Sequence, residues 1–377
     1  MTPVLCHLLD LTGFRNYHRL ALEPPTGGCL FIGPNGAGKS NLLEAIGLVS
    51  AGRGSNPSAG LELIRISQEG ERADFARVRA RVAVGDRLPQ LLEMVVAPGD
   101  GGRVSRRAWI EGRMRPRRDL IGRLPLVQFE PRDLELVGGQ PAARRRFANW
   151  AIGQADGEYV AALGDFERSR RQRNALLREL ALGPGKDPDR LDYWDDLLDT
   201  HGGVLVRARA GWLEQMSTRA QSHFARLARG PESVSLEYRP ALAELAPGSL
   251  AEALRRTRQR EIAVGNTLIG PHRDDFRIHV DGRLAAQFAS RGQQRLAVLC
   301  VKLALLDWLT EKIGQTPVLS LDEVFSELDP HHRNQLAEIL PADAQLFLAA
   351  ADRGLVPDSL VERCQPCALA DGDVKPL

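Results

Sequence analysis

At 377 residues, the chain is long enough to bury a large core and is expected to divide into two lobes. Its 50 Lys and Arg residues nearly balance its 48 Asp and Glu residues, and the net charge of +2 excludes a general polycationic surface, so any nucleic-acid surface must be a local patch. Five cysteines argue against a disulfide scaffold and fit a reducing cytosol. The first residues lack a secretory signal pattern, and no apolar stretch approaches ~18 residues, so we expect a cytoplasmic protein without a membrane span.

The first chemical motif is a glycine-rich loop at residues 33–40. It satisfies G-x-x-x-x-G-K-[ST], follows an apolar strand pattern at 29–32 and precedes a helical pattern at 41–46. This context predicts a phosphate site, because glycines let backbone N–H groups close around a β-phosphate at a helix N-terminus. Lys39 would reach the β- and γ-phosphates, and Ser40 would hold Mg²⁺. The predicted nucleotide contacts are Gly33, Pro34, Asn35, Gly36, Ala37, Gly38, Lys39, Ser40 and Asn41.

An arginine-dense hairpin is expected after predicted strands at 75–84 and 91–96, with its turn at Glu111-Gly112. Its arginines could contact DNA phosphates or could bridge to the protein's own carboxylates. Arginines 144–146 open a predicted helix, where a phosphate-facing role competes with solvent exposure or with bonding to the acidic segment 130–135. The candidate DNA contacts are Arg106, Arg107, Arg113, Arg115, Arg144 and Arg145.

The sequence texture changes between about residue 151 and residue 264. Segments 158–182, 190–229 and 248–264 are long, charged and helix-patterned, which predicts a helical lobe inserted into an α/β domain. At a rise of about 1.5 Å per residue, several helices sharing this length make a short stub. A long coiled-coil arm is therefore excluded.

Two later strings complete a nucleotide-hydrolysis pattern. Residues 317–323 read as a buried strand ending in Asp322-Glu323, where Asp322 would position the metal and Glu323 would polarise the attacking water. A loop at 290–294 opens a predicted helix and forms a second anion site, with Ser290, Gly292 and Gln293 as its contacts. Because one chain needs one loop for its own nucleotide, this second site suggests a cap on a nucleotide held by another subunit.

Gln128 follows the arginine-dense hairpin, at the end of a predicted strand. It could be the glutamine that senses Mg²⁺ and links the two lobes in heads of the ATP-binding-cassette type. An ordinary strand-end residue is equally compatible with the pattern.

Taken together, these strings closely resemble the RecF family of DNA-repair ATPases, which are relatives of the SMC heads. The resemblance is carried by Phe14-Arg15-Asn16-Tyr17, the loop at 33–40 with Asn41-Leu42-Leu43-Glu44, Gly139-x-Pro141-x-x-Arg144-Arg145, Gly270-Pro271-His272-Arg273-Asp274-Asp275, Ser290-x-Gly292-Gln293-Gln294-Arg295, and Asp322-Glu323-Val324-Phe325-Ser326-Glu327-Leu328-Asp329. It implies an α/β fold: a P-loop ATPase head of the ABC/SMC type with a short inserted helical lobe. The implied segments are 1–150 and 265–377 for the head and 151–264 for the lobe.

By the same resemblance, the protein would bind ATP and Mg²⁺, hydrolyse ATP weakly with stimulation by DNA, and form an ATP-dependent homodimer. It would bind DNA at single-strand gaps or junctions without sequence preference, and would help RecR- and RecO-like partners to load the strand-exchange protein.

The chain also departs from the family pattern. Arg291 stands where a neutral residue is usual, the loop at 53–57 diverges, and Ala349-Ala350-Ala351 replaces the usual threonines, which puts γ-phosphate sensing in doubt. A structural DNA clamp with an idle nucleotide site therefore stays open as an alternative, as does a divergent anti-phage SMC-like ATPase.

Overall fold

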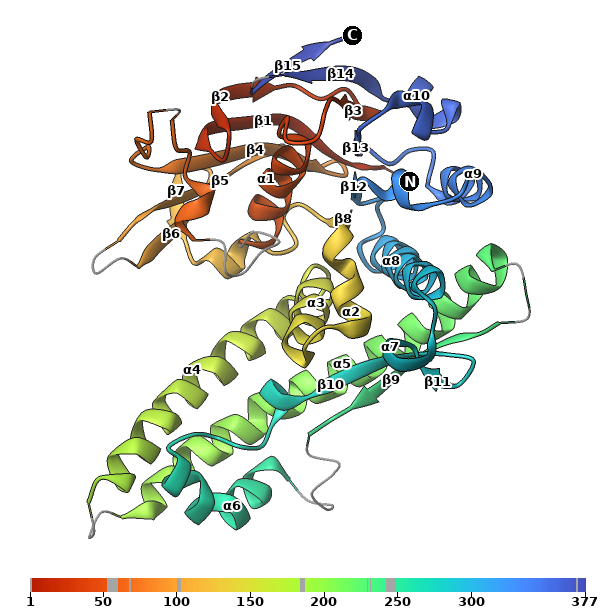
Figure 1. Cartoon of the computed structure of the whole chain (residues 1–377). Helices are drawn as coiled ribbons and strands as arrows, with labels where there is room; N and C mark the ends of the chain where they lie inside the picture. Colours follow the sequence, from red (N-terminus) through yellow and green to blue (C-terminus); the bar gives the residue numbers. More distant parts are fainter. Residues whose placement is uncertain are drawn as a thin grey trace. The chain divides into compact units, whose positions relative to one another are not determined.

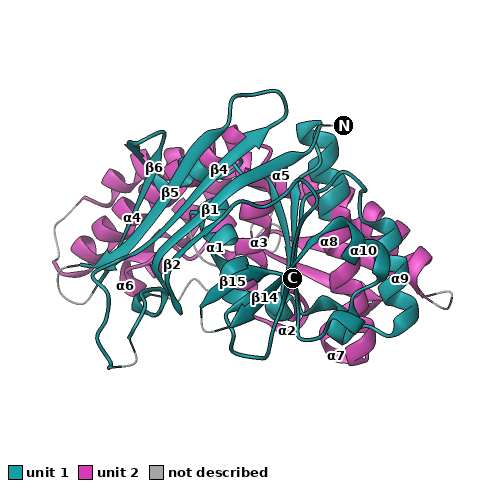
Figure 2. Ribbon diagram, turned by 90° about the horizontal axis from the view of Figure 1, so that it is seen from above, with its two compact units in different colours: residues 1–133, 305–377 teal, residues 134–304 magenta. Residues whose placement is uncertain are grey.

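The computed structural model describes residues 2–52, 60–67, 69–99, 103–183, 187–228, 230, 232–241, 249–370 and 372–377. It divides into two compact units, residues 1–133 with 305–377 and residues 134–304 (Figures 1 and 2). The divergent loop expected at 53–57 lies outside the described residues. Among the described residues, the longest helices are too polar to span a bilayer.

Unit 1 contains two sheets, each of six described strands. The antiparallel sheet has the order β2-β1-β4-β5-β6-β7, and its strands are β1 (Val4–Phe14), β2 (Tyr17–Leu22), β4 (Ala76–Val84), β5 (Gln90–Pro98), β6 (Val104–Ile110) and β7 (Arg113–Arg115). The other sheet has the order β15-β14-β3-β13-β12-β8 and is parallel from β14 to β8. Its strands are β3 (Gly28–Ile32), β8 (Leu126–Phe129), β12 (Val318–Asp322), β13 (Leu346–Ala350), β14 (Gln365–Ala370) and β15 (Asp373–Pro376).

The two sheets differ in the burial of their side chains. In β4, Ala76, Val78, Ala80 and Val82 are buried while the arginines between them turn away from the core, as expected for a strand with one wet face. Every residue of β12 and β13 is buried, including Ser320, which is the pattern of central parallel strands. Helix α1 (Lys39–Ala51) contacts strands of both sheets and is buried on most sides, so the core of unit 1 surrounds it.

The remaining helices of unit 1 follow the central strands. They are α9 (Pro330–Ile339) after β12 and α10 (Asp358–Arg363) after β13.

Unit 2 is built on two long helices that lie side by side, α4 (Gly157–Ala181) and α5 (Asp192–Leu227) (Figure 1). Helix α5 has 36 residues and is about 54 Å long, so the lobe is a stub, as expected. The other elements are α2 (Glu135–Gly138), α3 (Pro141–Gly153), α6 (Leu250–Val264), α7 (Ala285–Phe288) and a three-stranded sheet of β9 (Val234–Arg239), β10 (Asp275–Val280) and β11 (Arg283–Leu284). Helix α8 (Arg291–Ile313) crosses the division between the units.

The division differs from the segments expected from the sequence. Unit 2 begins at residue 134 and so includes α2 and α3, and it ends at residue 304, within α8, and so includes β9–β11. The sequence pattern did not predict β9, whose six residues all pair with β10. The division of the head into residues 1–150 and 265–377 stays a prediction.

A fully buried ion cluster holds three helices of unit 2 together, α4, α5 and α6. The Arg173 guanidinium on α4 contacts Asp195 on α5 through Nε at 2.6 Å and Glu261 on α6 through Nη2 at 2.7 Å. Its Nη1 also donates to Thr267 Oγ1 at 3.0 Å, and neither Arg173 nor its two carboxylate partners is exposed to solvent. Such a cluster makes the packing specific, because another arrangement of the helices would separate these buried charges from their partners.

Replacing Arg173 with methionine should therefore destabilise the protein strongly. The variant leaves the buried Glu261 carboxylate without its cation and leaves Asp195 with Arg258 alone, and removing one partner of a buried ion pair costs about 3–5 kcal/mol of unfolding free energy. Arg170→Met is the matched control, one helical turn away, because its ion pair with Glu167 is partly exposed and should cost less than about 1 kcal/mol. Urea unfolding of both variants measures the difference, and equal costs would show that the buried cluster carries no special share of stability.

Candidate nucleotide site

The glycine-rich loop runs from the carboxyl end of β3 into α1. Gly36 and Gly38 have positive φ angles of 86° and 106°, a backbone region that glycine adopts without strain. Gly38 caps α1, and a Cβ on it would lie 2.4 Å from Asn16 Nδ2 and 2.7 Å from the Tyr17 hydroxyl. The loop therefore needs glycine at position 38 for conformation and for space.

Lys39 is the buried cation of the site. Its Nζ donates to the backbone carbonyls of Gly33 at 2.9 Å and Pro34 at 3.2 Å, and it lies 3.3 Å from Glu323 Oε1. Only 4% of its side chain is exposed. A buried ammonium held by two carbonyls and one carboxylate is stiffly placed, and one of its three partners is itself an anion that a phosphate could replace.

Ser40 and Asp322 bring two oxygen ligands together. Ser40 Oγ donates to Asp322 Oδ1 at 2.9 Å, although the residues are 282 positions apart. Burial raises the pKa of the Asp322 carboxyl above its ordinary value, and the hydrogen bond from Ser40 opposes that shift. Asp322 is buried, whereas Ser40 is exposed to solvent. A hydroxyl beside a carboxylate is a donor set that a hard cation such as Mg²⁺ accepts.

Glu323 lies just past the end of β12 in the left-handed backbone region, with φ 55°. This conformation is uncommon for a residue with a Cβ and costs of order 1–2 kcal/mol. It is held by the bond from Glu323 N to Ala349 O at 3.1 Å and by the Ser326 hydroxyl, which donates to Glu323 O at 2.6 Å. The strained turn aims the carboxylate at Lys39.

The turn between β1 and β2 braces the glycine-rich loop. Asn16 Nδ2 donates to Ala37 O at 3.2 Å, Asn16 Oδ1 accepts from Asn41 Nδ2 at 2.8 Å, and the Tyr17 hydroxyl donates to Gly38 O at 2.9 Å. Arg15 pairs with both carboxylate oxygens of Glu44 on α1. Asn16 and Tyr17 were not among the predicted site residues, although the string that contains them contributes to the family resemblance.

Phe14 and Tyr17 are fully buried. They belong to the core of unit 1.

Gln128 lies in β8 and is 8% exposed. Its Nε2 donates to Leu43 O of α1 at 3.3 Å, and it packs so closely on Gly47 that a Cβ there would lie 2.6 Å from Gln128 Oε1. The amide is thus held against the helix that carries Lys39. Its role in sensing Mg²⁺ stays a prediction.

In unit 2, the loop at 290–294 forms a reciprocal capping box on α8. Ser290 N donates to Gln293 Oε1 at 2.8 Å, and Gln293 N donates to Ser290 Oγ at 3.2 Å. Gln293 Nε2 also donates to Glu232 Oε1 at 2.9 Å, and Gly292 is exposed. The polar groups expected to meet an anion therefore satisfy one another and a neighbouring carboxylate in this structure.

The candidate arginines separate into two kinds. Arg144 is 7% exposed, and its guanidinium binds both carboxylate oxygens of Asp275 at 2.7 and 2.9 Å as well as Gly139 O. Arg145 Nη1 donates to Asp274 O at 2.7 Å. We therefore do not keep these two as DNA contacts: they bond within unit 2, and the carboxylate partner of Arg144 is Asp275 rather than the acidic segment 130–135. Arg107, Arg113 and Arg115 of the hairpin are exposed, and Arg106 is half-buried.

Residues 270–275 form a turn whose side chains bond to several elements of unit 2. Asp274 is 2% exposed and accepts from Arg209 Nη1 at 2.9 Å, from the Tyr238 hydroxyl and from Ala241 N. His272 Nε2 lies 3.1 Å from Thr267 O, and burial lowers the pKa of the imidazole to about 3, so the ring is neutral. These hydrogen bonds hold a buried turn. Asp274 and Asp275 bond to arginine, tyrosine and backbone groups, and His272 bonds to a backbone carbonyl.

The chain resembles proteins of one family over nearly its whole length. The family model described as "RecF/RecN/SMC N terminal domain" matches residues 6–363. A "DNA replication and repair protein RecF" of Moorella thermoacetica is 37% identical over 365 residues, which cover 97% of this chain and 94% of that protein. A protein of the same name from Chloroflexus aggregans is 38% identical over 92% of each chain.

Solved structures agree with the sequence comparisons. "Structure of the recombination mediator protein RecF-ATP in RecFOR pathway" has a TM-score of 0.87 at 27% identity and covers 100% of this chain and 98% of that one. An Smc head domain from Pyrococcus furiosus has a TM-score of 0.55 at 17% identity, covering 99% and 96% of the two chains, and shows the fold alone. The fold expected from the sequence is therefore confirmed.

The tight packing at Gly38 predicts unequal costs for two alanine substitutions in the loop. In Gly36→Ala the added Cβ has no neighbouring atom within 4 Å, so the variant should lose about 1–2 kcal/mol of unfolding free energy from the positive φ alone. Gly38→Ala adds a clash with Asn16 and Tyr17 and should cost at least about 1 kcal/mol more. Chemical denaturation of the two variants tests this, and a Gly38→Ala variant no less stable than Gly36→Ala would contradict the described bracing.

Proposed function

The chain belongs to the RecF family, and on that premise we propose that it is an ATP-dependent DNA-binding protein of recombinational repair and replication restart. The observation that carries the proposal is the meeting of Lys39, Ser40, Asp322 and Glu323 within hydrogen-bond or ion-pair distance. A buried ammonium, a hydroxyl and two carboxylates at the carboxyl ends of parallel strands are suited to a metal-bound triphosphate. We expect the protein in the cytoplasm.

ATP would lie along residues 33–41, with Lys39 as its main electrostatic anchor. The family member solved with ATP supports this assignment. Ser40 and Asp322 would hold Mg²⁺, which when bound would neutralise charge on the phosphate oxygens. Gln128 would act beside them, through its contact with the same helix.

Glu323 would orient the attacking water. In the structure its carboxylate is the anionic partner of Lys39, at 3.3 Å. A γ-phosphate would compete for that ammonium, and its arrival would release the carboxylate toward water. Hydrolysis would be weak while the site is incompletely assembled, and binding of DNA would stimulate it.

The active unit would be an ATP-bound homodimer. Ser290, Gly292 and Gln293 of one chain would close over the nucleotide of the other, and the capping box at the start of α8 would exchange its internal bonds for bonds to the γ-phosphate. ATP would favour association because the dimer alone satisfies the phosphate from both sides.

The dimer would bind gapped DNA or single-strand–double-strand junctions and would help RecO- and RecR-like partners to load the recombinase. The solved relatives are described as recombination mediator proteins of the RecFOR pathway, which supports this role. Arg113 and Arg115, which are exposed on β7 of the β6–β7 hairpin, would supply contacts to phosphates without sequence preference.

One observation favours a second candidate, a DNA clamp whose nucleotide site is idle. Ala349 and Ala350 lie in buried β13 beside the Asp322–Glu323 strand, where a side-chain hydroxyl is missing. Ala349 offers Glu323 only a backbone carbonyl. A divergent anti-phage ATPase with the same head is the other alternative.

Glu323→Gln tests hydrolysis directly. The amide keeps the shape of the side chain but cannot take up a proton, so ATP binding should persist while turnover falls at least about 100-fold. Lys39→Ala should instead lose ATP affinity, because it removes the buried cation. Equilibrium ATP binding and phosphate release measure both effects. Turnover in Glu323→Gln equal to that of the unmodified protein would contradict the assignment, and so would undiminished affinity in Lys39→Ala.

Mixing two inactive variants tests the shared site. Ser290→Arg should bind ATP but neither dimerise nor hydrolyse it, because the bulky cation obstructs the loop. With Lys39→Ala, a mixed dimer holds one intact site, built from the Ser290→Arg chain's P-loop and the other chain's loop. We expect partial recovery of turnover on mixing. No recovery, with specific activity independent of protein concentration, would mean that each chain works alone.

A further inference from the structure

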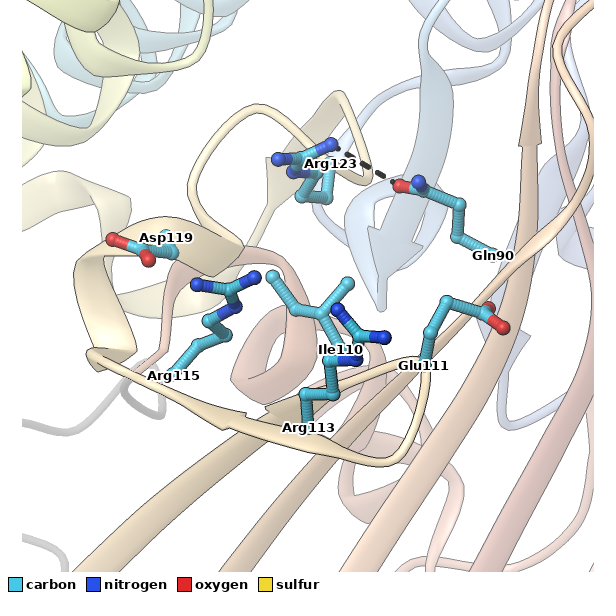
Figure 3. A pocket seen from close by; sticks show the side chains of 7 residues that line it. All are labelled: Gln90, Ile110, Glu111, Arg113, Arg115, Asp119 and Arg123. Carbon is cyan, nitrogen blue, oxygen red and sulfur yellow. Dashed lines mark hydrogen bonds between the residues drawn. The ribbon is translucent and has the colours of Figure 1, made fainter.

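A hollow of about 500 Å³ lies on the β6–β7 hairpin of unit 1 (Figure 3). It is lined by three arginines, Arg113, Arg115 and Arg123, around the apolar side chain of Ile110. In Figure 3 the guanidinium groups of Arg113 and Arg115 lie on the two sides of Ile110, and Arg123 bonds to Gln90 across the hollow at 3.2 Å. The volume exceeds what a lone phosphate needs and falls in the range of small-ligand pockets, about 300–1,000 Å³.

The register of the hairpin explains why these side chains gather. Ile110 pairs with Arg113, and Ala108 pairs with Arg115, so these four residues share one face. The residues between them point to the opposite face, where Met114 pairs with Trp109. Arg107 lies two positions before Trp109 in the same strand and therefore shares this opposite face. The hairpin arginines therefore divide into a face that lines the hollow and a face that carries Arg107.

The acids near the hollow have other partners. The Glu111 carboxylate accepts from Leu91 N on the neighbouring strand, and Asp119 lies 3.9 Å from Arg118 Nε. Arg113 and Arg115 are exposed, and neither guanidinium forms a hydrogen bond or ion pair with another described residue. Their donors are therefore available in the hollow, where a guanidinium presents a planar set of N–H groups suited to phosphate oxygens.

We propose that this hollow binds one nucleotide unit of a DNA strand, with the phosphate between Arg113 and Arg115 and the sugar against Ile110. The site rests on the proposed DNA-binding function and specifies the surface that performs it. A strand fits better than a free nucleotide, because two further exposed arginines, Arg117 and Arg118, lie in the chain between the lining residues Arg115 and Asp119 and add positive charge beside the hollow. Arg123, which the sequence pattern did not single out, is the third cation of the site.

The test compares two faces of one hairpin. The double variant Arg113→Gln/Arg115→Gln empties the hollow of two charges, and Arg107→Gln removes an exposed charge from the opposite face. Affinity for a gapped duplex is measured by fluorescence anisotropy with a non-hydrolysable ATP analogue, between about 50 and 200 mM salt. The double variant should lower the slope of log affinity against log salt by about 1, the loss of one phosphate contact, while Arg107→Gln leaves it nearly unchanged. Thermal unfolding confirms that both variants fold.

The outcomes separate the site from the function on which it rests. If the unmodified protein fails to bind gapped DNA, the proposed function is wrong. If it binds but the double variant changes the slope no more than Arg107→Gln does, the hollow is not the contact surface. A calorimetric titration with deoxyadenosine monophosphate tests whether the hollow binds a free nucleotide instead of a DNA strand. Millimolar binding that the double variant abolishes, with an unchanged DNA slope, would overturn the proposal in favour of a free-nucleotide site.

Discussion

A single ammonium group joins the parts of the nucleotide site: Lys39 Nζ bonds to two carbonyls of its own loop and lies 3.3 Å from Glu323. The contact exists because the parallel sheet places β13 between β3 and β12, so that the loop after β3 and the acids after β12 leave the same edge. Open α/β sheets bind ligands at the carboxyl ends of their strands for this reason. The hydrogen bonds from Asn16 and Tyr17 hold the loop in the position in which this ammonium reaches both the loop carbonyls and Glu323. Without that geometry, the two motifs would remain unconnected strings.

The parts of the site that local sequence determines could be predicted. The glycines of residues 33–40 indicate the loop, and a short apolar strand indicates where the Asp322-Glu323 pair lies. A hydrophobic period of 3.6 residues indicates the long helices of unit 2. Contacts between distant segments could not be predicted in the same way. Arg144 opens a helix as expected, yet its partner Asp275 lies 131 residues away, and no periodicity encodes that pairing.

The same limit explains the other differences. A pattern of Ser290 and Gln293 at a helix start is compatible with an anion site and with a self-capping box, because both use the same hydroxyl and amide. The short strand β9 became a strand through pairing with β10, a tertiary effect on a six-residue segment. Glu323 in the left-handed region is the reverse case: its sequence gives no warning of strain, and the strain marks the residue that faces Lys39.

We propose that this assembled site hydrolyses ATP in response to DNA, rather than serving as an idle pocket in a clamp. The most direct measurement is the rate of phosphate release by the unmodified protein, with and without a gapped duplex, at saturating ATP and Mg²⁺. We expect slow release that the gapped duplex increases and that rises more than linearly with protein concentration, because two chains build each site. Release indistinguishable from buffer, with DNA bound equally well in the presence and absence of ATP, would contradict it.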